Sequence, residues 1–173
     1  QSRNMYLYSP TNSDTFYVLD WDNDGMLMRK EYEIKQRSDG KSWENGISNY
    51  WGNMLFSRCL QTKSFRTALD KAIQDEYKYM NANRINSMVK HYRSITEQYV
   101  WKMPDSMYEG VTKSQYDVIA NQLHSEIEQN YQTYQTGFNK PMPFYIGTPT
   151  PTNGKLKLSW DVSYDFNDED LRY

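Results

Sequence analysis

The sequence predicts an α+β fold that is mainly α, with an N-terminal β-hairpin and acidic turn, a four-helix bundle and a C-terminal strand. Three observations predict it. Two short β-prone runs precede residue 25, apolar residues recur at helical spacing through much of residues 48–134, and polar and apolar residues alternate over residues 155–162.

Composition indicates one main domain and excludes several classes of partner. A chain of 173 residues can bury one sizeable core, and its 16% aromatic content, with sixteen tyrosines, predicts a core of large amphipathic rings. Lys plus Arg (20) nearly balances Asp plus Glu (22) without a basic block, so no nucleic-acid partner is expected. The single cysteine, Cys59, excludes an internal disulfide and a cysteine-based zinc cluster. No apolar run approaches the roughly 20 residues of a transmembrane helix.

The N-terminal hairpin is predicted from Met5–Tyr8 and Phe16–Leu19, which are separated by the turn-forming residues Ser-Pro-Thr-Asn-Ser-Asp. Its second strand runs directly into the acidic turn Asp20–Gly25, Asp-Trp-Asp-Asn-Asp-Gly.

Four amphipathic helices are predicted next, and we expect their apolar faces to bury one another. The first begins at Ser48, the second has Ser64 as its N-cap, the third ends before Pro104, and the fourth covers about Ser114–Tyr134. The tyrosines at helical spacing are expected to pack in the core instead of forming an exposed platform for sugars or peptides; they are Tyr77, Tyr79, Tyr92, Tyr99, Tyr131 and Tyr134.

The C-terminal part changes character. Residues 147–154, rich in Pro, Thr and Gly, are predicted to be a linker, and residues 155–162 a half-buried strand.

The acidic turn has two interpretations that involve a metal. Asp20, Asp22 and Asp24 stand two residues apart, so their carboxylates can converge on one hard cation. Residues 20–31 also match an EF-hand calcium loop, with Gly25 at position six and Glu31 at position twelve. A turn and a strand precede it where an EF-hand needs a helix, which favours a strand-flanked site. The third interpretation is a solvated turn without metal, whose carboxylates are offset by basic side chains.

Two stretches resemble the CotH kinase family, the atypical kinases similar to spore coat protein H. Asn4–Tyr8 followed by Phe16–Gly25 is similar to the family's strand pair that ends in a Trp-Asp-x-Asp-like turn. Asn49–Arg66 is similar to the helices that follow, with an Asn-x-Leu-Phe-x-Arg-like element before a Phe-Arg pair. Together these stretches place residues 4–135 in the resemblance.

The resemblance implies a compact kinase-like fold, here its C-lobe-like portion, that uses ATP with Mg²⁺ to phosphorylate Ser or Thr of secreted or coat proteins. It implies that Asp20 or Asp22 holds the metal, with Asn4 as a further ligand, and the spacing of the aspartates adds Asp24. Ca²⁺, with Glu31 as a ligand, is the alternative. The family's N-terminal lobe, phosphate-facing lysine and catalytic aspartate belong upstream of Asn4. We therefore expect a fragment of a longer kinase, inactive alone, or alternatively a calcium-stabilised extracellular module without catalysis.

The stretch Gly154–Phe166 resembles the opening strand of a fibronectin type III-like domain, in which a Leu-x-Trp pattern places a tryptophan in a sandwich core. The expected organisation is a CotH kinase-like portion over residues 1–146, a linker over 147–154 and the start of a β-sandwich over 155–173. This order implies a large extracellular or cell-envelope protein, whose partners are a protein substrate or neighbouring domains.

Overall fold

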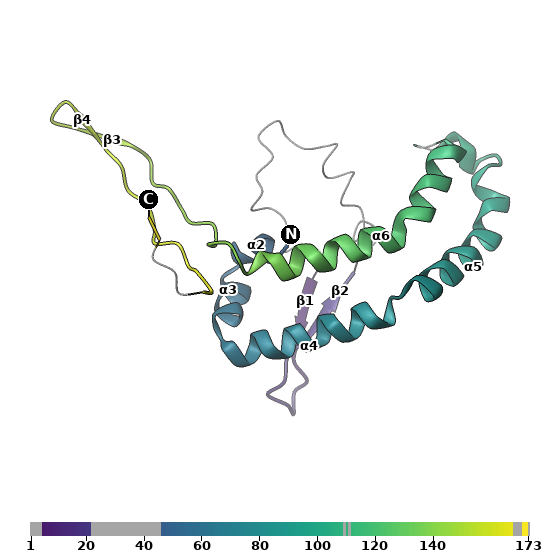
Figure 1. Cartoon of the computed structure of the whole chain (residues 1–173), viewed down its shortest axis with the longest axis horizontal. Coiled ribbons are helices and arrows are strands. Elements are labelled where there is room, and N and C mark those ends of the chain that lie inside the picture. Colours follow the sequence, from purple (N-terminus) through teal and green to yellow (C-terminus); the bar gives the residue numbers. More distant parts are fainter. Residues whose placement is uncertain (1–4, 22–45, 109, 111, 168–170, 173) are drawn as a thin grey trace. The chain divides into compact units, whose positions relative to one another are not determined.

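A computed structural model describes residues 5–21, 46–108, 110, 112–167 and 171–172, and the chain divides into two compact units, residues 1–38 and 39–173. The first unit contains a two-stranded hairpin, and the second contains the helices and a second hairpin (Figure 1). This confirms the predicted fold class, mainly helical with short antiparallel strand pairs towards the two ends.

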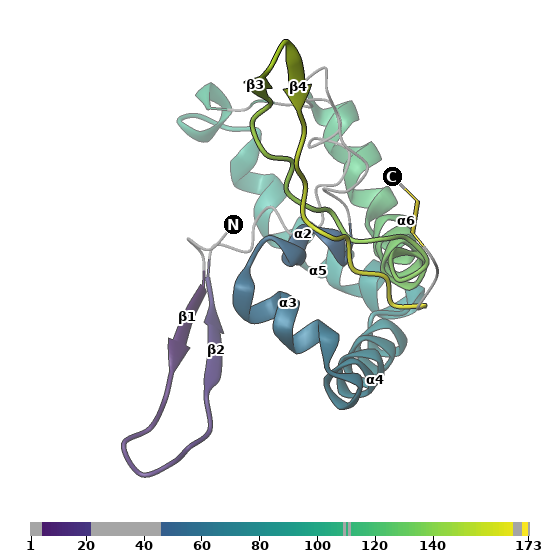
Figure 2. The ribbon, with the colours of Figure 1, turned by 90° about the vertical axis from the view of Figure 1, so that its left-hand side faces the viewer.

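The N-terminal hairpin pairs β1 (Met5–Tyr8) with β2 (Tyr17–Asp20) in antiparallel register (Figure 2). Tyr6 lies opposite Leu19 and Tyr8 lies opposite Tyr17, so these four side chains share one face of the hairpin. All four are exposed. A two-stranded hairpin of this size gains little stability by itself.

The predicted first helix is two short helices, α2 (Ser48–Trp51) and α3 (Met54–Gln61). The break lies at Asn53, whose backbone is extended and whose side-chain oxygen accepts hydrogen bonds from the N–H groups of Leu55 and Phe56. An asparagine that caps a helix start in this way satisfies amides that would otherwise be unpaired. The Asn53 cap therefore begins a new helix where periodicity alone predicted a continuous one.

The three long helices follow as predicted. They are α4 (Lys63–Tyr79), α5 (Ala82–Val100) and α6 (Lys113–Gly137), with the 3₁₀ turn η3 (Asp105–Met107) before α6. The prediction of Ser64 as an N-cap was wrong, because α4 starts at Lys63 and Thr62 holds the cap position. Capping side chains do begin the other two, Asn81 for α5 and a Thr112–Gln115 capping box for α6.

The three long helices form an open hairpin in which α4 and α5 follow one another and α6 runs back beside both (Figure 1). The core lies at the end where α2, α3 and α4 meet the C-terminal end of α6. Its centre is Ile47, Leu60 and Met142, which are exposed by 3%, 3% and 1%. Half-buried side chains surround it: Trp51, Leu69, Tyr134, Phe138, Tyr164 and Phe166.

The chain after α6 returns to this core. The Met142 N–H donates to the carbonyl of Tyr164 at 2.8 Å, and the Ser163 hydroxyl donates to the carbonyl of Met142. Tyr164 and Phe166 then pack against Trp51, with ring centres 5.2 and 5.8 Å from it. Side chains near the C-terminus thus complete the core of the helical unit.

A second hairpin lies between these two core contacts. It pairs β3 (Thr150–Thr152) with β4 (Lys155–Lys157) through Asn153 and Gly154, whose φ angles are 49° and 73°. Two left-handed residues are what a tight two-residue hairpin turn requires, and Asn-Gly is its preferred sequence. The strand at 150–152 falls within the predicted linker. Of the strand predicted over residues 155–162, the first three residues pair with β3 and Trp160 forms an isolated bridge with Ile146. The domain boundaries at 147 and 155, and the sandwich, stay predictions.

The expectation that the helices bury their apolar faces was wrong for α5. Met88, Tyr92, Ile95 and Tyr99 are exposed by 38%, 58%, 45% and 60%. The reason is that α6 meets α5 on another face, through an ion-pair network and a Trp101–Tyr116 ring contact at 5.5 Å. Among the described helices, none is long and apolar enough to span a membrane.

Candidate functional site

The acidic turn starts where the N-terminal hairpin ends. Asp20 is the last residue of β2 and is the partner of Met5, the first residue of β1. Asn4, Asp22, Asp24 and Glu31 lie outside the described residues, so their roles as metal ligands stay predictions. Within the described part of the chain, no group of three or more His, Cys, Asp or Glu side chains is placed to hold a metal.

Aromatic stacking orients the entry to this turn. The Trp21 ring stacks on Tyr6 with ring centres 6.3 Å apart and an interplanar angle of 15°, and Tyr8 packs against Tyr17 at 6.5 Å. Such pairs contribute about 0.5–1.5 kcal/mol beyond the area they bury. Trp21 follows Asp20 directly, so its stacking on β1 constrains the backbone on the C-terminal side of that carboxylate.

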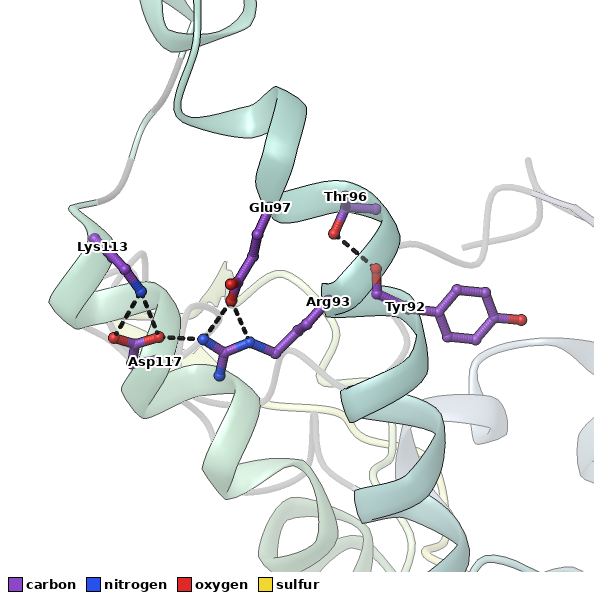
Figure 3. A network of polar contacts seen from close by, with 6 residues as sticks. All are labelled: Tyr92, Arg93, Thr96, Glu97, Lys113 and Asp117. Atoms are coloured by element: carbon purple, nitrogen blue, oxygen red, sulfur yellow. Dashed lines mark hydrogen bonds and ion pairs between the residues drawn. The ribbon is translucent and has the colours of Figure 1, made fainter.

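The helical unit holds a cluster of charges between α5 and α6. Arg93 of α5 donates hydrogen bonds to Glu97 and to Asp117 of α6, and Lys113 lies 3.3 Å from Asp117 (Figure 3). The hydrogen bond from Arg93 holds the pKa of Asp117 below its usual value, and the bond to Glu97 raises the pKa of Arg93. Because these charges are satisfied by one another, the cluster joins the two helices and offers no unpaired acid or base for catalysis.

An open cleft of about 420 Å³ lies between α4, the C-terminal half of α6 and the C-terminal segment. The Tyr134 hydroxyl donates to Asp70 there, and burial together with this carboxylate raises the pKa of Tyr134. Tyr131 stacks on Tyr77 with ring centres 4.0 Å apart. The core prediction therefore holds for Tyr134, which packs against the core, while Tyr77 and Tyr131 are half-buried against each other. It was wrong for Tyr79, Tyr92 and Tyr99, which are exposed by 50%, 58% and 60%.

Arg66 has a structural role in the same cleft. Its guanidinium donates to the carbonyl of Leu60 at 2.6 Å and lies 5.2 Å from the ring centre of Phe166. Phe166 is a hundred residues away in the sequence, and no local pattern indicates that contact.

Comparison with known proteins identifies the family. The family model described as CotH kinase protein matches residues 1–134, which include the hairpin, the acidic turn and the helices as far as Tyr134 of α6. No curated protein and no solved structure matches the chain. The matched segment contains both stretches on which the resemblance rests, and it leaves out the segment similar to a fibronectin type III strand. Since the match spans well over half of the sequence, the chain belongs to the CotH kinase family.

Proposed function

We propose that this chain supplies the metal-holding turn and the helical lobe of an atypical protein Ser/Thr kinase that uses ATP and a divalent cation. Membership of the CotH kinase family carries the proposal, because the family implies kinase-like chemistry with a nucleotide and a divalent metal. The position of Asp20 supports it, since Asp20 is the last residue of β2 and is held there by its pairing with Met5 of β1.

The aspartates of the turn would hold Mg²⁺ against the nucleotide phosphates. Phosphoryl transfer depends on positioning and on neutralising charge, and Mg²⁺ is usually bound through one or two carboxylates plus phosphate oxygens. We assign this role to Asp20 or Asp22, with Asp24 and Asn4 as further oxygen ligands. These carboxylates would hold and orient the metal, which would supply positive charge next to the transferred phosphoryl group.

The full-length protein, and not this chain alone, is the proposed enzyme. The resemblance places the family's phosphate-facing lysine and its catalytic aspartate upstream of Asn4. The chain alone should therefore bind a metal without transferring phosphate.

The test is autophosphorylation of the full-length protein with labelled ATP and Mg²⁺, compared among single variants. We expect one of Asp20→Asn and Asp22→Asn to lower the rate by at least about a hundredfold, the usual scale for removing a group that stabilises transition-state charge. Asp14→Asn is the matched control, because Asp14 carries the same charge in the loop between β1 and β2, away from the strand ends that open the turn. Full activity in both the Asp20 and Asp22 variants would refute the assignment of the metal site.

The calcium-loop spacing of Asp20, Asp22, Asp24, Gly25 and Glu31 supports a second candidate, a calcium-stabilised module without catalysis. Thermal unfolding of the full-length protein with Mg²⁺-ATP or with Ca²⁺ separates the kinase from the calcium-stabilised module. A ligand that binds only the native state raises the midpoint of unfolding. A rise with Ca²⁺ that Glu31→Gln abolishes, without phosphate transfer by the full-length protein, would favour the module. A midpoint unchanged by Mg²⁺-ATP and by Ca²⁺ would refute both candidates.

A further inference from the structure

The exposed face of α5 carries a row of large apolar side chains. Met88, Tyr92, Ile95 and Tyr99 follow one another at intervals of four, three and four residues, so they share one face over about 17 Å of helix. Their exposed fractions are 38%, 58%, 45% and 60%. Figure 3 shows Tyr92 pointing away from the side of α5 where Arg93 and Glu97 meet α6. This row, which we call the α5 stripe, therefore faces away from the other helix.

The composition of the α5 stripe is that of a binding surface. Single exposed apolar side chains are normal, but a contiguous row of them marks an interaction site. Tyrosine and methionine are enriched at protein interfaces, and methionine adapts its shape to the side chains of a partner. Tyr79 at the end of α4 and Met103 after α5 are exposed as well, by 50% and 70%.

Positive charges flank the α5 stripe. Arg84 lies one helical turn before Met88, Lys102 follows about one turn after Tyr99, and both side chains are exposed. Arg84 is held in place, since its guanidinium lies 3.6 Å from the ring centre of Tyr79. The one acidic residue of α5 is Glu97, and it lies on the opposite side, paired with Arg93. The exposed row on α5 therefore has one cation a helical turn before it and another just after the helix ends.

We propose that the α5 stripe is a docking surface for an acidic amphipathic helix of a protein partner. An apolar row on a helix is complemented by the apolar face of another helix, and the two cations select a partner with carboxylates near both ends. A second copy of this chain fits less well, because both possible pairings bring positive charges together. Arg84 would meet Arg84 in a parallel pair of α5 helices and Lys102 in an antiparallel pair. An anionic membrane also fits less well, since lipid-binding segments gather about four to eight basic residues.

The experiment measures binding of the whole chain to two synthetic helical peptides by fluorescence anisotropy. Both peptides carry leucines on one face, with glutamates on the other face in the first and lysines in the second. We expect the glutamate peptide to bind at least about tenfold more tightly, with a difference that shrinks at high salt. A Tyr92→Ser, Ile95→Ser double variant should lose at least about tenfold in affinity, because aromatic anchors dominate interfaces. Arg84→Glu with Lys102→Glu should reverse the preference between the peptides.

The matched control is the Tyr145→Ser, Ile146→Ser double variant, which removes the same two residue types from the C-terminal segment, where they are exposed by 66% and 65%. Circular dichroism confirms that each variant folds. The proposal is refuted if neither peptide binds, if both bind equally, or if the control pair weakens binding as much as the stripe pair. Sedimentation that shows a dimer dissociated by the stripe pair would assign the surface to a second copy. Binding to phosphatidylserine vesicles in place of the peptides would assign it to a membrane.

Discussion

Replacing Phe166 by alanine tests whether the C-terminal segment belongs to the helical unit. The Phe166 ring lies 5.1 Å from Phe138 of the helical region and 5.8 Å from Trp51 of α2, and the Arg66 guanidinium lies 5.2 Å from its centre. Removing a buried phenylalanine side chain costs about 3–5 kcal/mol. Because Phe166 is only half-buried, we expect a loss of about 2–3 kcal/mol of unfolding free energy, or about 4–12 °C in melting temperature.

The assay is urea unfolding followed by circular dichroism at the helical band, which reports α4–α6 and not the C-terminal segment itself. The matched control is Val162→Ala, four residues earlier and 85% exposed, which should change the unfolding free energy by less than about 0.5 kcal/mol. If Phe166→Ala also stays within about 0.5 kcal/mol of the wild type, the segment does not stabilise the helices. That result would support the separate sandwich module that the sequence predicted for residues 155–173.

Three further changes test individual contacts. Asn53→Ala should cost about 1 kcal/mol in urea unfolding, because it removes the side-chain cap of α3; an unchanged midpoint would show that the cap contributes nothing. Asp117→Ala should speed hydrogen exchange in α5 by releasing Arg93, whereas Asp75→Ala, which breaks an exposed pair within one helix, should not; equal effects would refute the bridging role of Asp117. Tyr134→Phe should lower stability at neutral pH, and the gap from the wild type should narrow above about pH 10. There Tyr134 ionises in the unfolded state while the raised pKa keeps it protonated in the folded state, so the wild type loses stability that the variant does not; a gap that widens would contradict this sign.

Local features of the fold were predictable from the sequence. The hairpin of β1 and β2 and the three long helices were predicted because their signals lie within a few residues: turn formers between β-prone runs, and apolar spacing at helical period. The family resemblance was predictable for the same reason, since its motifs lie within residues 4–25 and 49–66. The match to the CotH kinase family over residues 1–134 confirms it.

Features that depend on distant contacts were not predictable. The sequence indicated a linker near residue 150, but Met142 and Phe166 on either side of that region pack into the helical core. Their partners, Leu60 and Trp51, are more than eighty residues away, and the spacing of apolar residues does not predict contacts between such distant segments. The break at Asn53 is a different case, because asparagine is a common N-cap and this local signal was present in the sequence. The prediction followed the apolar spacing across it instead.

The error on α5 has a physical reason that bears on function. Helical periodicity identifies an apolar face, but it does not say which surface covers that face. In this chain the contact between α5 and α6 uses the Arg93–Asp117 ion pair and the Trp101–Tyr116 rings, which turn the α5 stripe away from α6. An apolar face that the other described helices leave uncovered must find its complement elsewhere or stay in water at a cost of about 25 cal/mol for each Å². The same periodicity that was expected to build the core therefore supports the docking surface proposed on α5.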